Sequence, residues 1–207
     1  LNVEQIILEQ VNSHSTLFQT LDKYHHQKEV SCSIYSIWLK GESAESVLAK
    51  LSSKMRASIS SKLRKLEAEH KLEIVGSTSL DDYEKLVPEF RRIVRARRGT
   101  DLSDEKYARR LASIQGIHKG GAFKFFYLKV DNEIAAFRIG FLHQNVYFEW
   151  KSCHDSKYNL YSLGDIMTWL MIKEHMRTGI TAHNFMAGEY VYKQRWSTAE
   201  LTTENLK

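Results

Sequence analysis

Residues 184–196 combine the end of an apolar run with cations and aromatic side chains, a composition suited to binding negative charge. The apolar run closes at a pair of small residues, and the segment that follows carries Lys193 and Arg195 among tyrosines. Ligands of open α/β sheets gather at strand ends. A cation there can stabilise charge that develops on an acyl carbonyl or that resides on a phosphate. The alternative is that the aromatic side chains only pack and that the cations extend along them to water.

A second candidate site is the short segment Tyr161–Asp165, which precedes an apolar helical pattern. Its glycine permits a ligand to approach the backbone, and the first amides of a helix attract anions. Ser162, Leu163, Gly164 and Asp165 therefore form a candidate site for a phosphate-bearing ligand. The same residues also fit a plain helix cap made by the serine or the aspartate.

Four polar residues are candidates for acceptor binding and proton transfer: Glu149, Asp155, His183 and Tyr192. Glu149 alternates with aromatic residues in a strand-like run, so it can face a cleft as a general base. A glutamate on a solvated strand face fits that alternation equally well.

Other chemistries lack their usual spacing. None of the nine histidines falls into a His-x-His or His-Glu-x-x-His pattern, so we expect no metal site. No Gly-x-Ser-x-Gly turn is present, and Cys153 and His154 are direct neighbours, a poor geometry for a nucleophile and its base. Cys32 and Cys153 are the only cysteines, and we expect two reduced thiols. These absences favour direct attack over a covalent intermediate.

The formal net charge is +5, and its excess is local. Five arginines lie between residues 91 and 98, and Arg109 and Arg110 follow. This cluster fits either a solvated helix face or a surface for a polyanion such as a CoA pyrophosphate, a carrier protein or RNA. No apolar run reaches the roughly 18 residues of a membrane span, and the first residues do not form a secretion segment, so we expect a cytoplasmic protein.

The elements that position these residues divide into two kinds. The first part of the chain predicts helices over residues 2–12, 44–70, 79–98 and 103–118, and strands over 30–39 and 72–75. Residues 123–150 then form three apolar and aromatic runs with short polar turns, which predict an antiparallel meander. A helix over 164–177 and a strand over 180–186 follow. A meander, a helix and a further strand predict an α/β fold with a mixed sheet.

Several of these motifs occur together in one known family. A basic segment covers residues 54–67, and a later block contains Asp155, Tyr158 and Ser162-Leu163-Gly164. The final block contains Asn184-Phe185, Gly188-Glu189, Tyr192-Lys193 and Trp196. In this order, from about Ile34 to Trp196, the sequence resembles the CelD/BcsL-like family, which is related to the FemAB aminoacyltransferases within the GNAT acyltransferase superfamily.

The resemblance implies a GNAT-type fold, a mixed and largely antiparallel sheet flanked by helices, with an N-terminal helical extension. It assigns carbonyl stabilisation to Lys193 and substrate binding to Asp155, Tyr158, Glu189 and Trp196. It also implies that residues 1–43 are the end of a preceding lobe or a linker and that residues 44–207 are the acyltransferase domain.

Two positions depart from the family pattern. Leu163 replaces a proline, and Asn184 replaces an aspartate, so residue 184 cannot act as a carboxylate base. The Gln/Arg-x-x-Gly-x-Gly/Ala run of typical acetyl-CoA users is also absent. The donor therefore stays open between acyl-CoA or acetyl-CoA, an acyl-carrier protein and an aminoacyl-tRNA, with an amine or hydroxyl of a small molecule or envelope precursor as the acceptor. A non-catalytic binding lobe is the third alternative.

Overall fold

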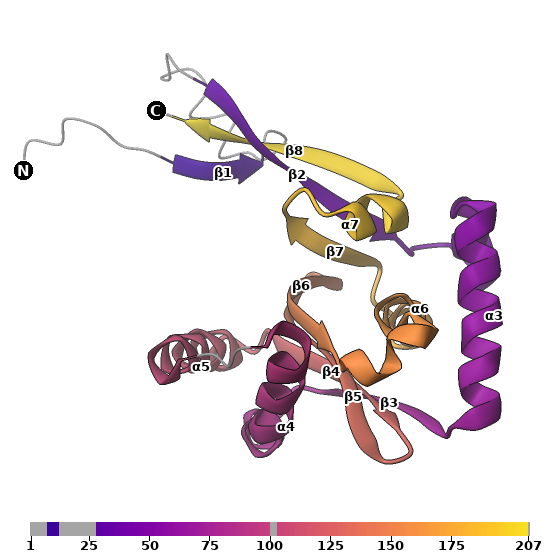
Figure 1. Ribbon diagram of the computed structural model, residues 1–207. Coiled ribbons are helices and arrows are strands. Elements are labelled where there is room, and N and C mark those ends of the chain that lie inside the picture. Colours follow the sequence, from indigo (N-terminus) through magenta and orange to yellow (C-terminus); the bar gives the residue numbers. More distant parts are fainter. Residues whose placement is uncertain (1–7, 13–27, 100–102, 207) are drawn as a thin grey trace, which may run out of the picture. The chain divides into compact units, whose positions relative to one another are not determined.

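The computed structural model describes residues 8–12, 28–99 and 103–206, which fall into two compact units (Figure 1). Unit 1 contains the described residues of Leu1–Trp38 and Asn184–Lys207, and unit 2 is Leu39–His183. The sequence predicted a different division, at residue 43, between a preceding lobe and an acyltransferase domain. That division stays a prediction.

Unit 2 contains four strands and five α-helices among its described residues. Their order is α2 (Ala44–Lys50), α3 (Ser53–Glu69), β3 (Leu72–Ser77), α4 (Leu80–Arg98), α5 (Asp104–Lys119), β4 (Phe123–Val130), β5 (Glu133–His143), β6 (Val146–His154), the 3₁₀ helix η2 (Ser156–Tyr161) and α6 (Leu163–Arg177). The strands pair antiparallel in the order β6-β5-β4-β3. The predicted meander over residues 123–150 is thereby confirmed.

Serine caps define the starts of the first four helices. The side chains of Ser43, Ser52, Ser79 and Ser103 each accept a hydrogen bond from an amide of the following turn. The single helix predicted over residues 44–70 is wrong in one respect, because Leu51 is extended and Ser52 caps a new helix. Helix α4 runs through Pro88 and ends at Gly99, whose φ of 71° is the left-handed conformation expected there.

The sheet of unit 2 has a core on each face. On β4, Phe125 lies 5.7 Å from the ring of Tyr83 on α4, whereas its neighbour Phe126 lies 5.2 Å from His175 on α6. Successive side chains of a strand point to opposite faces. Helix α4 therefore packs on one face and α6 on the other, as the sequence predicted for the helix that follows the meander.

A bulge between β5 and β6 separates two residues that simple alternation would put on one face. Ile139 pairs with Lys151, but the next residue, Gly140, pairs with Glu149, so Trp150 is the extra residue. Glu149 contacts Arg138 on the α6 face. Lys151 lies opposite Ile139, a core residue of the α4 face.

Unit 1 is built from β1 (Leu8–Asn12), β2 (Lys28–Trp38), most of β7 (Ala182–Ala187), α7 (Val191–Trp196) and β8 (Ala199–Leu206). The strand order is β1-β8-β2-β7, and β8 pairs antiparallel with both β1 and β2. The helix predicted over residues 2–12 is wrong for Leu8–Asn12, because pairing with β8 makes this segment a strand. Residues 2–7 lie outside the described part of the chain. The strand β8 was not predicted.

Taken unit by unit, the fold is mixed α/β with mostly antiparallel strands and flanking helices. This confirms the predicted fold class. It also confirms the strands predicted over residues 30–39 and 72–75 and the helices predicted over 79–98 and 103–118.

We predict that Gly140→Ala destabilises the protein by about 2–3 kcal/mol, as expected for overpacking. A Cβ at this position would lie 2.1 Å from the carbonyl oxygen of Phe148 and 2.8 Å from the hydroxyl of Tyr147. Gly116→Ala in α5 is the control, because its Cβ meets nothing within 4 Å and alanine favours a helix by up to about 1 kcal/mol. Urea unfolding measures both variants, and equal stability of the two would contradict the close approach at the bulge.

Candidate functional site

The turn before α6 presents backbone amides beside a lysine. Ser162 adopts a left-handed conformation (φ 51°, ψ 50°), and its carbonyl accepts the amides of Asp165 at 2.9 Å and Ile166 at 3.2 Å. The Ser162 hydroxyl does not cap the helix. It accepts a hydrogen bond of 2.5 Å from Nζ of Lys62 on α3. The turn therefore combines a helix N-terminus with an ammonium group, an arrangement that favours a phosphate.

The other residues predicted for this turn have different surroundings. The side chain of Leu163 is fully buried in the core, so only its backbone can face a ligand. Gly164 lies against His154, because a Cβ on the glycine would be 3.4 Å from the imidazole ring. Asp165 is half-buried at the first turn of the helix.

Behind the turn lies a buried chain of charged and polar groups. Arg138 donates a hydrogen bond of 3.1 Å to the carbonyl of Gly164, and its Nε lies 3.1 Å from the carboxylate of Glu149. The same carboxylate oxygen lies 3.3 Å from Nε2 of His183, whose Nδ1 is 3.2 Å from Nε2 of His175. All four side chains are at least 95% buried. The structure thus brings together Glu149 and His183, two of the predicted site residues.

Burial keeps two histidines of this region neutral at pH 7. It lowers the pKa of His175 well below its usual value, and the neighbouring His183 adds to the effect. Burial also lowers the pKa of His154 to about 4, with further repulsion from Arg138 and Arg97. The guanidinium of Arg138 is therefore the permanent positive charge that the carboxylate of Glu149 faces.

Asp155 and Tyr158 belong to η2, away from the Arg138 chain. Asp155 caps η2 and accepts a hydrogen bond of 2.6 Å from Arg92 on α4. Burial raises the pKa of this carboxyl, but the bonds from Arg92 and the Lys157 amide outweigh burial and hold the pKa below its usual value. Tyr158 is buried beneath the ammonium of Lys157, 4.9 Å from its ring centre.

In unit 1, Lys193 is a buried residue of α7, with 5% of its surface exposed. Its Nζ donates hydrogen bonds to the carbonyls of Ala187 at 2.6 Å and Met186 at 3.2 Å, at the end of β7. These bonds fix the direction of the ammonium group. The alternative of an exposed lysine that extends along aromatic rings does not describe this residue.

Asn184 shapes the end of β7. Its side-chain oxygen accepts the amide of Met186 at 2.7 Å, and its side-chain nitrogen donates to the hydroxyl of Ser36 at 3.1 Å. Met186 has a φ of 57°, an uncommon conformation for a residue other than glycine. The amide at position 184 therefore holds the turn whose carbonyls bind Lys193.

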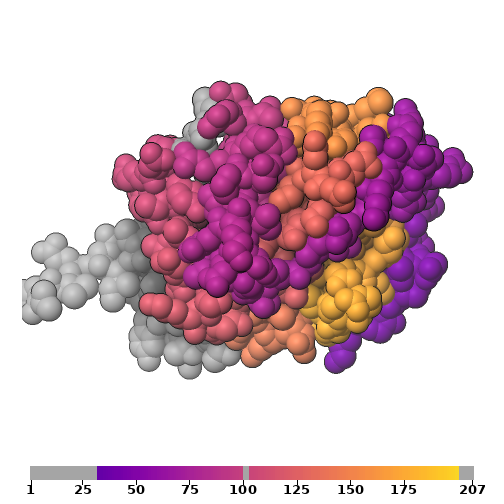
Figure 2. Space-filling model, turned by 90° about the horizontal axis from the view of Figure 1, so that it is seen from below, coloured from indigo at the N-terminus to yellow at the C-terminus, as the bar shows by residue number. Residues whose placement is uncertain are grey.

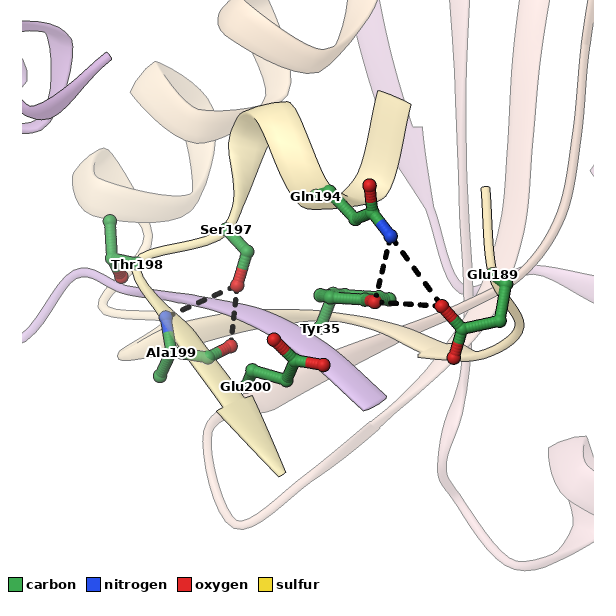
Figure 3. Close-up of a pocket in the computed structure, with 7 residues that line it drawn as sticks. All are labelled: Tyr35, Glu189, Gln194, Ser197, Thr198, Ala199 and Glu200. Atoms are coloured by element: carbon green, nitrogen blue, oxygen red, sulfur yellow. Dashed lines mark hydrogen bonds between the residues drawn. The ribbon is translucent and has the colours of Figure 1, made fainter. Parts of the chain in front are cut away.

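A polar pocket of about 480 Å³ lies in unit 1 beside α7 (Figure 3). Glu189 enters it and accepts hydrogen bonds of 3.1 Å from the hydroxyl of Tyr35 and from the Ser33 amide. The Ser33 amide and then the Tyr35 hydroxyl lower the pKa of this carboxyl. Glu200 lines the same pocket, so the pocket favours a cationic or hydrogen-bonding group.

The two remaining predicted residues of unit 1 lie near α7's apolar side. The Tyr192 ring is half-buried and packs edge-on against Phe185 at 6.0 Å. Trp196 is fully buried. The indole ring of Trp196 is therefore placed to pack rather than to meet a substrate from solvent.

Three residues of the candidate site were missed: Lys62, Arg138 and His154. Arg138 lies on β5, which is buried on both faces and so gives no alternating pattern, and His154 lies on β6 beyond the bulge at Trp150. Lys62 reaches Ser162 across 100 residues of sequence, a contact that no local pattern signals.

An antiparallel meander, a left-handed turn with a cation beside it and a helix that begins at that turn make unit 2 an α/β domain with a candidate anion site. Residues 53–194 match the acetyltransferase (GNAT) domain family, and the chain belongs to this family. Among curated proteins, none matches it significantly.

Several solved structures share the fold. L-PGS from Bacillus licheniformis gives a TM-score of 0.65 at 12% identity, over 97% of this chain and 66% of that chain. A C-terminal domain from Agrobacterium fabrum gives a TM-score of 0.68 at 10% identity, over 97% of this chain and 66% of that chain. FemX gives a TM-score of 0.64 at 10% identity, over 92% of this chain and 67% of that chain. The chain thus spans about two thirds of these proteins, and the identities establish a shared fold alone.

None of the helices described is both long and apolar enough to cross a membrane. Within the same residues, no group of three or more His, Cys, Asp or Glu is arranged to hold a metal ion.

We predict that Arg138→Met costs about 3–5 kcal/mol of unfolding free energy, because it leaves the buried Glu149 carboxylate without a permanent cation. Adding Glu149→Gln should restore part of this loss. The matched control is Arg109→Met with Glu105→Gln, an exposed pair 3.6 Å apart whose loss should cost less than about 1 kcal/mol. Urea unfolding of each double-mutant cycle measures the coupling. If the losses of unfolding free energy from Arg138→Met and Glu149→Gln simply add in the double variant, the two side chains are not coupled, which would contradict a stabilising ion pair.

Proposed function

We propose that this chain is the catalytic domain of a cytoplasmic acyltransferase. It moves an acyl group from a thioester donor, acyl-CoA or an acyl-carrier protein, to an amine or hydroxyl of a small molecule or cell-envelope precursor. Membership of the GNAT domain family supports this activity. The observation that carries the proposal is the turn at Ser162, where Lys62 and the start of α6 provide positive charge for the phosphate of such a donor.

The donor side fits the residues present. Gly164 stands at the first turn of α6, where a Cβ would lie 3.4 Å from the imidazole of His154. The neutral imidazole of His154 adds no positive charge, so Lys62 and the amides of the turn would supply the attraction. Arg138 holds the Gly164 carbonyl and so fixes the orientation of this turn. A donor phosphate would bind the amides of the turn and Lys62.

The chemical step in this proposal needs positioning and charge stabilisation, not a covalent nucleophile. The acceptor nitrogen or oxygen attacks the thioester carbonyl and the C–S bond breaks. The proton that the acceptor loses passes to the departing thiolate, which leaves as a free thiol. Lys193 is the candidate for stabilising the carbonyl oxygen. Glu189 and its pocket are candidates for holding an acceptor amine. Glu149, His183 and Tyr192 remain candidates for proton transfer.

The donor turn is tested by Gly164→Ala, which should weaken the binding of coenzyme A by about tenfold as its methyl group fills the space beside the amides. Thermal stability should stay nearly unchanged, because the added Cβ is at ordinary contact distance from His154. Gly116→Ala serves as the control for a glycine-to-alanine change in a helix. Calorimetry measures the affinity, and an unchanged value for Gly164→Ala would place the donor elsewhere.

The role of Lys193 is tested by Lys193→Met, which keeps most of the aliphatic stem. If the ammonium stabilises the transition state, turnover should fall by about 10²–10³-fold, with donor affinity much less affected. Stability should also fall by about 1–3 kcal/mol, because two buried carbonyls lose their donor. Arg195→Met, an exposed change in the same helix, is the control. If Lys193→Met lowers the stability but leaves turnover normal, the role of Lys193 is structural and not catalytic.

A FemAB-like transferase that uses aminoacyl-tRNA is the second candidate. The groove lined by Val87, Pro88, Arg91, Arg92 and Arg95, with a volume of about 380 Å³, favours it because arginines bind phosphates in a bidentate manner. Binding of tRNA that weakens steeply with salt would support this donor. A domain that binds neither coenzyme A nor tRNA would instead be a non-catalytic lobe.

A further inference from the structure

Among the described residues of unit 2, three cations have no carboxylate partner, unlike the arginines beside them. On α4, Arg91 pairs with Asp104 at 3.1 Å and Arg92 with Asp155 at 2.6 Å. In contrast, no carboxylate of the described residues pairs with Arg98, with Arg110 on α5 or with Lys151 on β6. These three residues are called the basic cluster below.

The fold brings the basic cluster to one face of the sheet. Arg110 lines a small cavity together with Val94 and Ile139. Lys151 pairs directly with Ile139 across the β5–β6 ladder, so its side chain projects on the same face. Arg98 lies one helical turn beyond Val94 on α4. The bulge at Trp150 is what turns Lys151 toward these two helices.

The charges of the basic cluster oppose one another. Partial burial lowers the pKa of Lys151, and Arg110 and Arg98 lower it further. Partial burial likewise lowers the pKa of Arg110, with a contribution from Arg98. The ammonium of Lys151 also lies 5.2 Å from the centre of the Trp150 ring. Arg110 and Lys151 are therefore partly desolvated cations that no described carboxylate neutralises. Such groups raise the free energy of the folded protein, and a bound anion would reduce that cost.

We propose that Arg98, Arg110 and Lys151 form an anion site that takes a phosphate group. Two guanidinium groups and an ammonium match the charge and the several acceptor oxygens of a phosphate better than those of a single carboxylate. Figure 2 shows residues of α4 and α5 at the surface. Arg98 is exposed, and Arg110 and Lys151 are half-buried, so a ligand can reach them from solvent. The face is the one opposite to Arg138 and the α6 turn, so this site is distinct from the donor turn.

The proposal rests on the proposed function only for the origin of the phosphate, which belongs either to the donor or to the acceptor. The site itself is tested with inorganic phosphate, observed through the indole N–H resonance of Trp150. The resonance should shift saturably with phosphate and not with chloride at equal ionic strength. Lys151→Met and Arg110→Met should each weaken this binding by about tenfold or more. Arg109→Met, the exposed neighbour paired with Glu105, should leave it unchanged.

Thermal melting separates a binding role from a structural one. Without phosphate, Lys151→Met should melt no lower than the unchanged protein, because it removes repulsion. Phosphate should raise the melting temperature of the unchanged protein and of Arg109→Met, but not of Lys151→Met. A phosphate response equal to that of chloride, or equal responses in all variants, would overturn the site.

Two further titrations identify the source. If coenzyme A displaces the phosphate, as read from the resonance of Trp150, the phosphate group that binds at this site belongs to the donor. If glycerol phosphate displaces the phosphate, and coenzyme A binds without a change in the resonance of Trp150, the site belongs to a phosphorylated acceptor. Calorimetry with coenzyme A alone reports on the proposed function. Failure of that binding with an intact phosphate response would remove acyl-CoA as the donor in the proposed function and leave the anion site standing.

Discussion

The buried ion pair between Arg138 and Glu149 is the interaction on which the site in unit 2 depends. The 3.1 Å contact between guanidinium and carboxylate lies on the α6 face of the sheet, and another nitrogen of Arg138 holds the carbonyl of Gly164. A buried charge of either sign alone would be costly, so each residue requires the other. The same guanidinium also helps to keep His154 neutral beside the turn. The position of the first turn of α6 and the charge balance behind it are thus set by one side chain.

The bulge at Trp150 determines on which face of the sheet Glu149 meets Arg138. Glu149 and Lys151 are two residues apart, and a regular strand would direct both to the same face. With Trp150 as the extra residue, Glu149 meets Arg138 on the α6 face, while Lys151 reaches the side of α4 and α5. Gly140 makes the close approach possible, since a Cβ would meet the backbone of Phe148 at 2.1 Å. One irregular residue therefore separates an ion pair on one face from a group of cations on the other.

Much of unit 2 could be predicted because its signals are local. Serine caps at Ser79 and Ser103, the left-handed glycine at residue 99 and the alternation of the meander act within a few residues. The predictions failed where a distant partner decides the structure. Leu8–Asn12 carries helical spacing but becomes a strand because β8 pairs with it. In the candidate site, Ser162, Gly164 and Glu149 could be selected from their types and positions. Arg138 and Lys62 could not, because their partners lie 26 and 100 residues away.

Asn184 stands where the sequence resemblance led us to expect an aspartate, and its amide makes two hydrogen bonds at the end of β7. An aspartate there could accept the amide of Met186 as Asn184 does, but a carboxylate has no proton to donate to Ser36. The asparagine satisfies both partners and adds no charge close to Lys193. Because the ammonium binds the carbonyls of Met186 and Ala187 at this same turn, its net positive charge is not offset by a neighbouring carboxylate at 184. The substitution removes a potential base and at the same time leaves Lys193 the stronger electrostatic group at the end of β7.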